Sequence, residues 1–337
     1  MNGKRTVFLA QNQCEMEAFD VPERLTGNQI LTKTLTSLIS AGTEVSLYNG
    51  THTTHQNPDI AYGKYPFRPG YAACGEVIGL GPDVKSLKMG DQVLTRGPHA
   101  SHHIASENAV YVCPKGVSPE EASLAVLAAV SLNGIRHSNI TLGSITVIVG
   151  QGLLGLFALL FAKMGGAHPL IVADLSEKRL ELSKQLGADD TVCSAKTNLL
   201  DAITTATKNK MADRVIEVTG LSKLIPDCLK LLRKGGMLYL LGGAHGKVEV
   251  DFYSYLVRNN LSIVGGHEAG AAMAEDYHFP WTVSANIRHC LDLMACGKMD
   301  VGPLISDRIA PDEVPKYYAE LSENAGDHLG VVIDWTK

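Results

Sequence analysis

The feature that most constrains this chain is the segment SITVIVGQGLLGLFALL at residues 144–160. An apolar strand-like run leads into a glycine-rich turn, and an apolar helix-like run follows it. The turn is Gly150-Gln151-Gly152-Leu153-Leu154-Gly155, the pattern G-x-G-x-x-G. Glycines at these positions allow a tight turn, close approach of the backbone to a pyrophosphate and close packing of helix on strand. The helix N-terminus then offers free N–H groups to phosphates, so the segment predicts a dinucleotide site.

An acidic residue stands where such a site needs one. Asp174 ends the next predicted strand, and its carboxylate would accept hydrogen bonds from both ribose hydroxyls of NAD while repelling the 2′-phosphate of NADP. Arg179, one helical turn farther along, would soften that preference. The alternatives are a tight strand–helix turn in an unrelated α/β fold and, for Asp174, an acid near the start of the helix predicted at 176–186. The predicted cofactor is NAD.

The composition narrows the class of protein. The chain has 337 residues, enough for two domains, and its net charge of −5 argues against a nucleic-acid partner. Its seven cysteines form no C-x-x-C pair, which predicts neither a disulfide framework nor a zinc ribbon and favours a reducing compartment. The longest apolar run, 153–162, is too short to cross a bilayer. We expect a cytoplasmic protein that binds a small-molecule substrate, and neither nucleic acid nor membrane.

The predicted secondary structure changes along the chain from mostly β-strands to alternating strands and helices. The first third is predicted to be mostly β, with strands at 6–10, 29–40, 75–81, 91–96 and 103–112. A helix start at Ser118-Pro119-Glu120-Glu121 then opens an alternation of strands and helices, which implies a parallel sheet covered on both faces. The strands are predicted at 144–149, 169–173, 215–218, 237–241 and 261–264, with helices at 153–164 and 176–186. The tail at 328–337 is strand-like, and it either rejoins the first domain or forms a small appendage on the second.

Taken together, these segments resemble the medium-chain dehydrogenase/reductase superfamily, of the zinc alcohol dehydrogenase kind. The segments that carry the resemblance are SLISAGTEVSLYNG, PFRPGYAACGEVIGLG, MGDQVL, VGQGLLG, ADLSEKRLELSKQLGAD, VIEVTG and LLRKGGMLYLLG. The resemblance implies an α/β protein with a GroES-like catalytic domain at 1–124 and 291–337, a Rossmann NAD-binding domain at 125–290, and a homodimer or homotetramer. To the cofactor site it adds Thr219, Gly242, Gly243, Gly265, Gly266 and His267, although a solvated loop is the alternative for His267.

The family's zinc ligands are absent from this chain. Carried over residue by residue, they fall at Ala41, Tyr71, Ala72 and about Val126, and none of these binds zinc. The run of four cysteines that holds the family's structural zinc is also absent. The resemblance therefore predicts no metal. The pattern S-x-I-S-x-G-T-E looks like a branch containing bacteriochlorophyllide, glycoside and cyclitol dehydrogenases, and residues 277–294 are similar to its zinc-free glycoside-oxidising members.

Without a metal, a positioned group must move the hydroxyl proton as hydride leaves. Thr43 aligns with the family's proton-relay hydroxyl, with a helix-capping threonine as the alternative. Glu44 aligns with an acid that orients a zinc-binding histidine, so a Glu44–Tyr71 hydrogen bond is expected here, and a helix N-terminal acid is the alternative. Tyr71 stands where the zinc would be, either as a general acid or as a residue that fills the space and binds substrate.

A histidine-rich stretch, GPHASHHIAS, follows the strand that borders the family's substrate pocket. His99 is the candidate for acid–base work, because an imidazole titrates near neutral pH. A metal site is the alternative, but strand geometry would send His102 and His103 to opposite faces. Polar segments at 51–57, 98–103 and 267–278 offer many hydrogen-bond partners, which suits a sugar-like substrate.

Three functions remain open from the sequence. The first is an NAD-dependent oxidoreductase that transfers a hydride between nicotinamide and a secondary alcohol or ketone of a sugar, glycoside or cyclitol, without catalytic zinc. The second is a zinc-free enone or quinone reductase, which would prefer NADPH, against the indication of Asp174. The third is a non-catalytic NAD-binding protein, against the retention of Thr43 beside an intact glycine turn.

Overall fold

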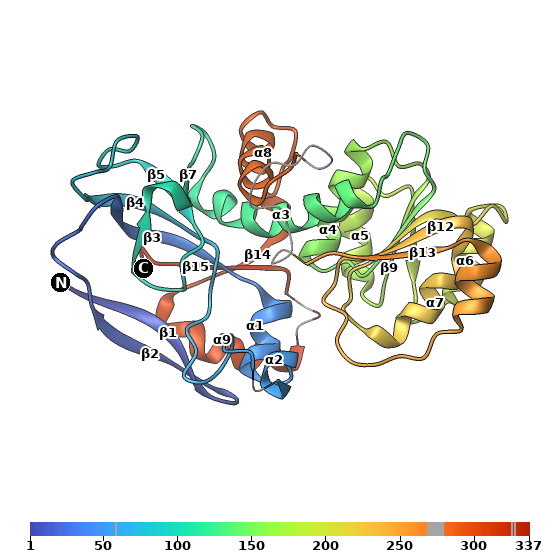
Figure 1. Ribbon diagram of the computed structural model, residues 1–337, viewed down its shortest axis with the longest axis horizontal. Coiled ribbons are helices and arrows are strands. Elements are labelled where there is room, and N and C mark those ends of the chain that lie inside the picture. The colour runs from blue at the N-terminus through green and yellow to red at the C-terminus, as the bar shows by residue number, and fades with distance from the viewer. Residues whose placement is uncertain (58, 268–279, 325, 327) are drawn as a thin grey trace. The chain divides into compact units, whose positions relative to one another are not determined.

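The structure, a computed structural model, describes residues 1–57, 59–267, 280–324, 326 and 328–337. The chain divides into two compact units (Figure 1). Unit 1 is Met1–Leu127 with Ile287–Lys337, and unit 2 is Ala128–Asn286. Among the described residues, no helix combines the length and the apolar character needed to cross a membrane.

Unit 1 is built on antiparallel β-structure. A hairpin of β1 (Asn2–Ala10) and β2 (Gln13–Asp20) accompanies a seven-stranded sheet. In order across it, the sheet contains β14 (Ile305–Ile309), β15 (Gly330–Asp334), β3 (Gln29–Ile39), β4 (Ala73–Leu80), β5 (Gln92–Thr95) and β7 (Val110–Val112), and β6 (His102–Ser106) also pairs with β3. The C-terminal strand β15 pairs antiparallel with β3, Val332 opposite Leu38. The prediction that the tail rejoins the first domain is therefore confirmed.

One predicted strand of unit 1 is wrong in its extent. The segment predicted as a single strand at 103–112 forms β6 and β7, separated by a 3₁₀ turn at Glu107–Ala109. The Ser106 hydroxyl accepts a hydrogen bond from the Asn108 N–H at 3.3 Å. A hydroxyl that bonds the backbone two residues ahead favours a turn over an extended strand.

Helices complete the core of unit 1. They are α1 (Ala41–Tyr48), α2 (Thr53–Gln56) and α9 (Val314–Asn324). Phe8 of β1 packs edge-on against Tyr318 of α9, with ring centroids 4.8 Å apart, and Tyr48 of α1 stacks on Tyr318 at 5.8 Å. Tyr318 and Phe8 are wholly buried. Aromatic packing therefore ties the C-terminal helix to the first strand and first helix of the chain.

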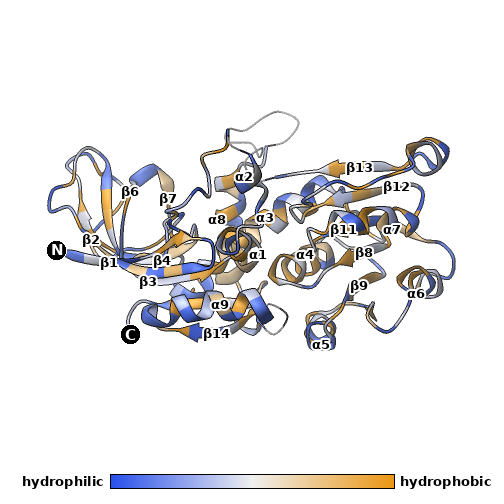
Figure 2. Cartoon of the chain, turned by 90° about the horizontal axis from the view of Figure 1, so that it is seen from below, coloured by the Kyte–Doolittle hydropathy of each residue, from blue (hydrophilic) through white to orange (hydrophobic). Residues whose placement is uncertain are grey.

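Unit 2 is a parallel sheet in the order β10-β9-β8-β11-β12-β13. Counted along the chain, this is third, second, first, fourth, fifth, sixth, the order of a dinucleotide-binding doubly wound fold. The strands are β8 (Thr146–Val149), β9 (Leu170–Asp174), β10 (Asp190–Cys193), β11 (Ala212–Glu217), β12 (Leu232–Leu240) and β13 (Ser262–Gly265). The central strand β8 is buried throughout (Figure 2), and its neighbour β11 buries Ala212 and its last three residues, Val215, Ile216 and Glu217. The predicted α/β class, with a Rossmann-type parallel sheet in one of two units, is confirmed.

The remaining helices are α3 (Pro119–His137), α4 (Leu153–Met164), α5 (Glu177–Leu186), α6 (Leu199–Ala206), α7 (Ile225–Lys230) and α8 (Val283–Ala295). The helix start predicted at Ser118 is confirmed by a capping box: Glu121 N–H donates to Ser118 Oγ at 3.2 Å, and Ser118 N–H donates to Glu121 Oε2 at 2.8 Å. Helix α4 matches its predicted bounds.

Candidate dinucleotide site and buried polar network

The glycine-rich turn joins β8 to α4 in unit 2. Gly150 has φ of +101°, and a Cβ at Gly155 would lie 2.0 Å from the Gly150 carbonyl oxygen. Both positions therefore require glycine, one for its backbone conformation and the other for the contact of helix with turn. Gly152 is the N-cap of α4, and a Cβ there would meet no atom within 4 Å. The open space lies where a phosphate would approach the helix N-terminus.

Asp174, at the end of β9, is fixed beside this turn. Its Oδ2 accepts a hydrogen bond from the Gln151 N–H at 2.6 Å, and its Oδ1 accepts one from the Ser176 N–H at 2.8 Å. The carboxylate is partly exposed, and each oxygen keeps a further lone pair for a hydroxyl. Arg179 is partly buried in the first turn of α5. The arrangement suits recognition of a ribose diol by Asp174.

The side chain of Gln151 lies inside the protein, and the part of Gln151 in cofactor binding stays a prediction. Its side chain is wholly buried, and it donates from Nε2 to the Gly150 carbonyl at 2.9 Å while its Oε1 accepts from the Ser183 hydroxyl at 3.0 Å. The buried side chain of Gln151 therefore stabilises the turn through these hydrogen bonds. Leu153 and Leu154 are partly buried in the first turn of α4.

The other predicted cofactor residues follow the carboxyl ends of neighbouring strands. Parallel strands bring these ends to one edge of the sheet, and ligands bind there at the point where the strand order reverses, here between β8 and β11. Thr219 follows β11 and contacts the turn, since a Cβ on Gly150 would lie 2.9 Å from Thr219 Cγ2. Gly242 and Gly243 follow β12, Gly265 ends β13, and Gly266 and His267 come next. Residues 268–279, which include parts of two predicted segments, lie outside the described residues.

Unit 1 holds a separate, buried network of polar side chains around Glu44. Glu44 Oε2 accepts hydrogen bonds from His99 Nε2 at 3.0 Å and from the Tyr318 hydroxyl at 2.5 Å, and its Oε1 accepts one from the Ser40 N–H at 3.2 Å. The other ring nitrogen, His99 Nδ1, lies 2.8 Å from Ser37 Oγ. Glu44, His99 and Tyr318 are at most 1% exposed. The three hydrogen bonds offset part of the cost of removing the carboxylate from water.

The directions of the hydrogen bonds around Ser37 and His99 follow from the indole N–H of Trp335, which can only donate. Trp335 Nε1 donates to Ser37 Oγ at 2.9 Å. The arrangement that satisfies every group then has the Ser37 hydroxyl donating to His99 Nδ1, and His99 Nε2–H donating to Glu44. Both ring nitrogens of His99 are bonded within the protein, so the geometry gives His99 a positioning role. Its predicted acid–base role stays a prediction.

Tyr71 forms the partly exposed end of this network. Its hydroxyl donates to Ser40 Oγ at 2.5 Å, so the expected hydrogen bond from Tyr71 to Glu44 is wrong, and Ser40 stands between them. Thr43 lies in the first turn of α1, two residues after that helix begins at Ala41, and its side chain also hydrogen-bonds Tyr71. Burial, then the charge of Glu44, raises the pKa of Tyr71 above that of a free phenol, against the opposing effect of the bonds with Ser40 and Thr43.

A catalytic zinc does not fit the residues present. Ala72 and Val126 are buried apolar side chains, and the Tyr71 hydroxyl is engaged with Ser40. Within the described ranges, no group of three or more His, Cys, Asp or Glu side chains is placed to hold a metal ion.

The sequence reasoning missed four members of the network. Ser37 and Ser40 lie in the segment that carried the family resemblance, and the hydroxyls in S-x-I-S-x-G-T-E were the available signal. Tyr318 and Trp335 had no local signal, because they meet their partners across 274 and 298 residues of chain.

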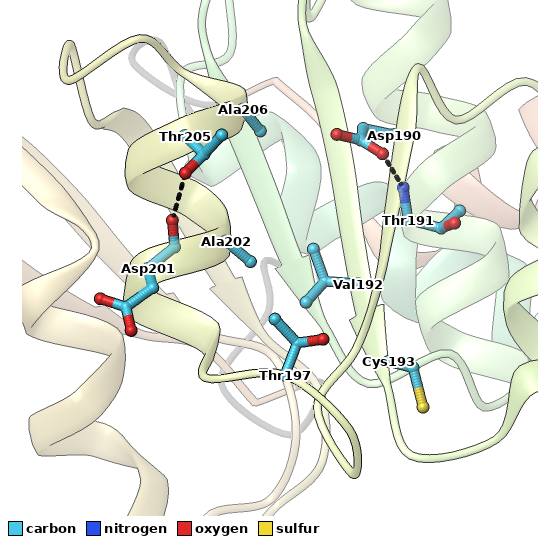
Figure 3. Close-up of a pocket in the computed structure, with 9 residues that line it drawn as sticks. All are labelled: Asp190, Thr191, Val192, Cys193, Thr197, Asp201, Ala202, Thr205 and Ala206. Carbon is cyan, nitrogen blue, oxygen red and sulfur yellow. Dashed lines mark hydrogen bonds between the residues drawn. The ribbon is translucent and has the colours of Figure 1, made fainter.

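A cavity of about 410 Å³ lies elsewhere in unit 2, between β10 and α6 (Figure 3). Its polar groups bond within the chain: Asp190 Oδ1 accepts from the Thr191 N–H at 2.8 Å, and the Thr205 hydroxyl donates to the Asp201 carbonyl at 2.9 Å. None of the predicted cofactor residues lines it. The cavity is therefore set apart from the glycine-rich turn.

A doubly wound sheet with this turn at its switch point, in one chain with a GroES-like β unit, defines a two-domain dinucleotide-dependent dehydrogenase architecture. Residues 37–135 match the family described as alcohol dehydrogenase GroES-like domain, and residues 154–279 match the family described as zinc-binding dehydrogenase. The chain belongs to the medium-chain dehydrogenase/reductase superfamily.

Named relatives agree with this assignment. The chain is 26% identical over 324 residues to the L-threonine 3-dehydrogenase of Pyrococcus horikoshii, with 87% of each chain covered. It is 26% identical over 281 residues to the L-idonate 5-dehydrogenase of Vitis vinifera, covering 73% of this chain and 72% of that one. A structure from Sinorhizobium meliloti 1021, solved with NADP bound, has a TM-score of 0.81 at 21% identity and 99% coverage of both chains. At that identity, the likeness establishes the fold.

Proposed function

We propose that the chain is an NAD-dependent oxidoreductase that transfers a hydride between nicotinamide and a secondary alcohol or ketone of a sugar, glycoside or cyclitol, without catalytic zinc. The coarser class, an NAD(P)-dependent dehydrogenase acting on CH–OH groups, agrees with both named relatives. The observation that carries the proposal is Asp174, held beside the glycine turn by the N–H groups of Gln151 and Ser176. A carboxylate at that point favours the ribose diol of NAD over the 2′-phosphate of NADP.

When bound, the nicotinamide supplies the hydride chemistry, and the chain must handle the proton. The Tyr71 phenol is the partly exposed group suited to that task. Because its pKa lies above the usual value for tyrosine, Tyr71 is neutral at physiological pH and donates a hydrogen bond. A neutral phenol serves best as the acid that protonates a ketone during reduction, after which the phenolate regains its proton from water. In oxidation the phenol orients the alcohol, and the hydroxyl proton passes to water as hydride leaves.

The buried network holds Tyr71 in place. Ser40 links Tyr71 to Glu44, because the Ser40 hydroxyl accepts a hydrogen bond from Tyr71 and the Ser40 N–H donates one to Glu44. Glu44 is in turn fixed by His99 and Tyr318. These residues act by orientation, since Glu44 and His99 have almost no exposed surface.

The substrate class rests on hydrogen-bonding capacity and on the relatives. Residues 51–57 and 98–103 of unit 1 are rich in histidine, threonine and serine, which pair with the hydroxyls of polyhydroxylated compounds. The two named relatives are dehydrogenases of L-threonine and L-idonate, small compounds with hydroxyl groups. We also propose a homodimer or homotetramer in a cytoplasmic, reducing environment, which light scattering of the purified protein and localisation of a tagged chain would test.

The decisive experiment is a screen of NAD reduction over sugars, glycosides, inositols and simple secondary alcohols, each with and without a chelator. We expect turnover with a polyhydroxylated compound, undiminished by chelator, and substoichiometric zinc by metal analysis. Loss of turnover on chelation, or one tightly held zinc per chain, would overturn the zinc-free mechanism. Reduction of enones or quinones by NADPH instead would assign a reductase, and binding of NAD with no turnover of any compound would assign a binding protein.

A further inference from the structure

We propose that Glu217 is a positioning residue of the dinucleotide site, one that anchors the loop at 218–220 for cofactor binding. The inference rests on the proposed function, because it assumes that unit 2 binds NAD. Glu217 is the last residue of β11, at the edge of the sheet where the glycine-rich turn lies. Its register partner on β8 is Val149, immediately before Gly150.

The side chain of Glu217 accepts hydrogen bonds from the loop that follows it. Its Oε1 accepts hydrogen bonds from the Thr219 N–H at 2.6 Å, from the Gly220 N–H at 3.2 Å and from the Thr219 hydroxyl. Gly220 has φ of +74°, which turns the chain back toward the carboxylate. Glu217 is wholly buried whereas Thr219 is exposed, so a buried anion holds the base of a surface loop.

The main chain of Glu217 fixes a second loop. Its carbonyl oxygen accepts hydrogen bonds from the N–H groups of Leu241 and Gly242, both at 2.9 Å. The two loops touch backbone to backbone, since a Cβ on Gly242 would lie 2.5 Å from the Gly220 nitrogen. Thr219 also contacts the glycine-rich turn. A shift of the loop at 218–220 would therefore disturb three of the segments that line the predicted site.

The anchor has an energetic cost that argues for a role beyond packing. Burial raises the pKa of Glu217, and the bonds from Thr219 and Gly220 oppose that shift only in part. Among the ion pairs between described residues, none involves Glu217. A buried carboxylate without a cation is less favourable than a neutral side chain of the same shape. The position thus bears a charge that stability alone does not require.

The test compares Glu217→Gln with a matched control at the other end of the same strand. Gln keeps the shape and one acceptor oxygen but removes the charge that strengthens the three hydrogen bonds. In the control, Asp213→Asn, the original carboxylate likewise accepts a backbone N–H, that of Ile145 at 2.8 Å, but far from the ligand edge. We expect Glu217→Gln to weaken NAD binding about tenfold by fluorescence titration and Asp213→Asn to leave it within about twofold.

A thermal readout separates positioning from structural damage. Since the folded pKa of Glu217 is raised, its protonated form favours folding at acidic pH, and this stabilisation is lost as pH rises through the folded pKa. The neutral Gln escapes that loss, so the Tm of Glu217→Gln relative to wild type should rise as pH increases above the usual glutamate pKa of about 4.3. Weaker NAD binding in a protein of equal or higher Tm at pH 8 supports the proposal. Unchanged NAD binding in Glu217→Gln overturns it.

Two further measurements cover the remaining outcomes. Glu217→Asp keeps the charge on a shorter side chain and should recover part of the affinity lost in Glu217→Gln, and no recovery would count against a charge-based anchor. Amide hydrogen exchange at Thr219 and Gly220, without nucleotide, should be faster in Glu217→Gln than in wild type. If wild type binds no dinucleotide, the proposed function fails, while faster exchange still supports the anchor and unchanged exchange refutes it.

Discussion

Replacing Tyr318 by Phe removes a single hydroxyl from the buried network of unit 1. That hydroxyl donates to Glu44 Oε2 at 2.5 Å, and both residues are almost completely buried. Burial, followed by the charge of Glu44, raises the pKa of Tyr318 well above its usual value, so the group is a donor at every accessible pH. The variant keeps the ring and its packing against Phe8. The change therefore isolates one hydrogen bond to a carboxylate.

The expected loss of stability depends on the hydrogen bonds that Glu44 retains in Tyr318→Phe. A hydrogen bond to a charged group contributes about 1.5–3 kcal/mol. Glu44 keeps its hydrogen bonds from His99 and Ser40, so it does not become an unpaired buried charge. We therefore expect Tyr318→Phe to lower the free energy of unfolding by about 2 kcal/mol. For a domain of about 150–250 residues this corresponds to a fall in Tm of roughly 4–8 °C.

The assay is thermal unfolding by circular dichroism without nucleotide, with Tyr317→Phe as the control. Tyr317 is the preceding residue of α9, and its hydroxyl donates to Asp307 Oδ1 at 2.6 Å in a partly exposed setting where water can replace it. Tyr317→Phe should lower the free energy of unfolding by less than about 1 kcal/mol. Equal losses in the two variants, or a Tm of Tyr318→Phe within about 1 °C of wild type, would refute the assignment of Tyr318 as a stabilising partner of Glu44.

Three further outcomes are expected. Asp174→Asn should reduce the preference for NAD over NADP at least about tenfold, because the repulsive charge is lost, and nucleotide titration showing an unchanged ratio would contradict the role of Asp174. Tyr71→Phe should lower turnover without lowering Tm. Since the pKa of Tyr71 is raised, its protonated form persists as pH rises, so wild-type rates should show no loss from phenol ionisation up to about pH 10. Gly155→Ala should abolish nucleotide binding, because its Cβ would lie 2.0 Å from the Gly150 oxygen, and fluorescence titration with wild-type affinity would refute that close contact.

The dinucleotide edge was predictable because its signals are local. The turn at Gly150–Gly155 and Asp174 lie within one strand–helix–strand unit, and the physical need for glycine at each position is written in the sequence itself. Glu217 was missed although it is local too. A carboxylate that ends the apolar run Val215-Ile216, two residues before Thr219-Gly220, was the signal, and its burial became visible only with β8 and β12 on either side.

The network of unit 1 was predictable only in part. Glu44, Tyr71 and His99 were singled out through the family resemblance. In the structure His99 bonds Glu44 directly, and Ser40 links Tyr71 to Glu44. The complete burial of His99 was not predictable, because His99 lies between β5 and β6 and its partners Ser37 and Glu44 are 62 and 55 residues away in the sequence. In unit 2, strand β10 was also missed, since only Val192 of its four residues is buried and the strand carries little apolar signal.

The long sequence separations within the network bear on how the chain is made. Ser37 and Trp335 are 298 residues apart, and Glu44 and Tyr318 are 274 apart, with all of unit 2 between them. A ribosome adds about 5–20 residues per second, so the early partners wait on the order of 15–60 s for the late ones. During that interval Glu44 lacks the donor from Tyr318, and β3 lacks the pairing of β15. Unit 2 has its full sequence first, so unit 1 is expected to reach its final packing last and to be the part that depends most on chaperones during synthesis.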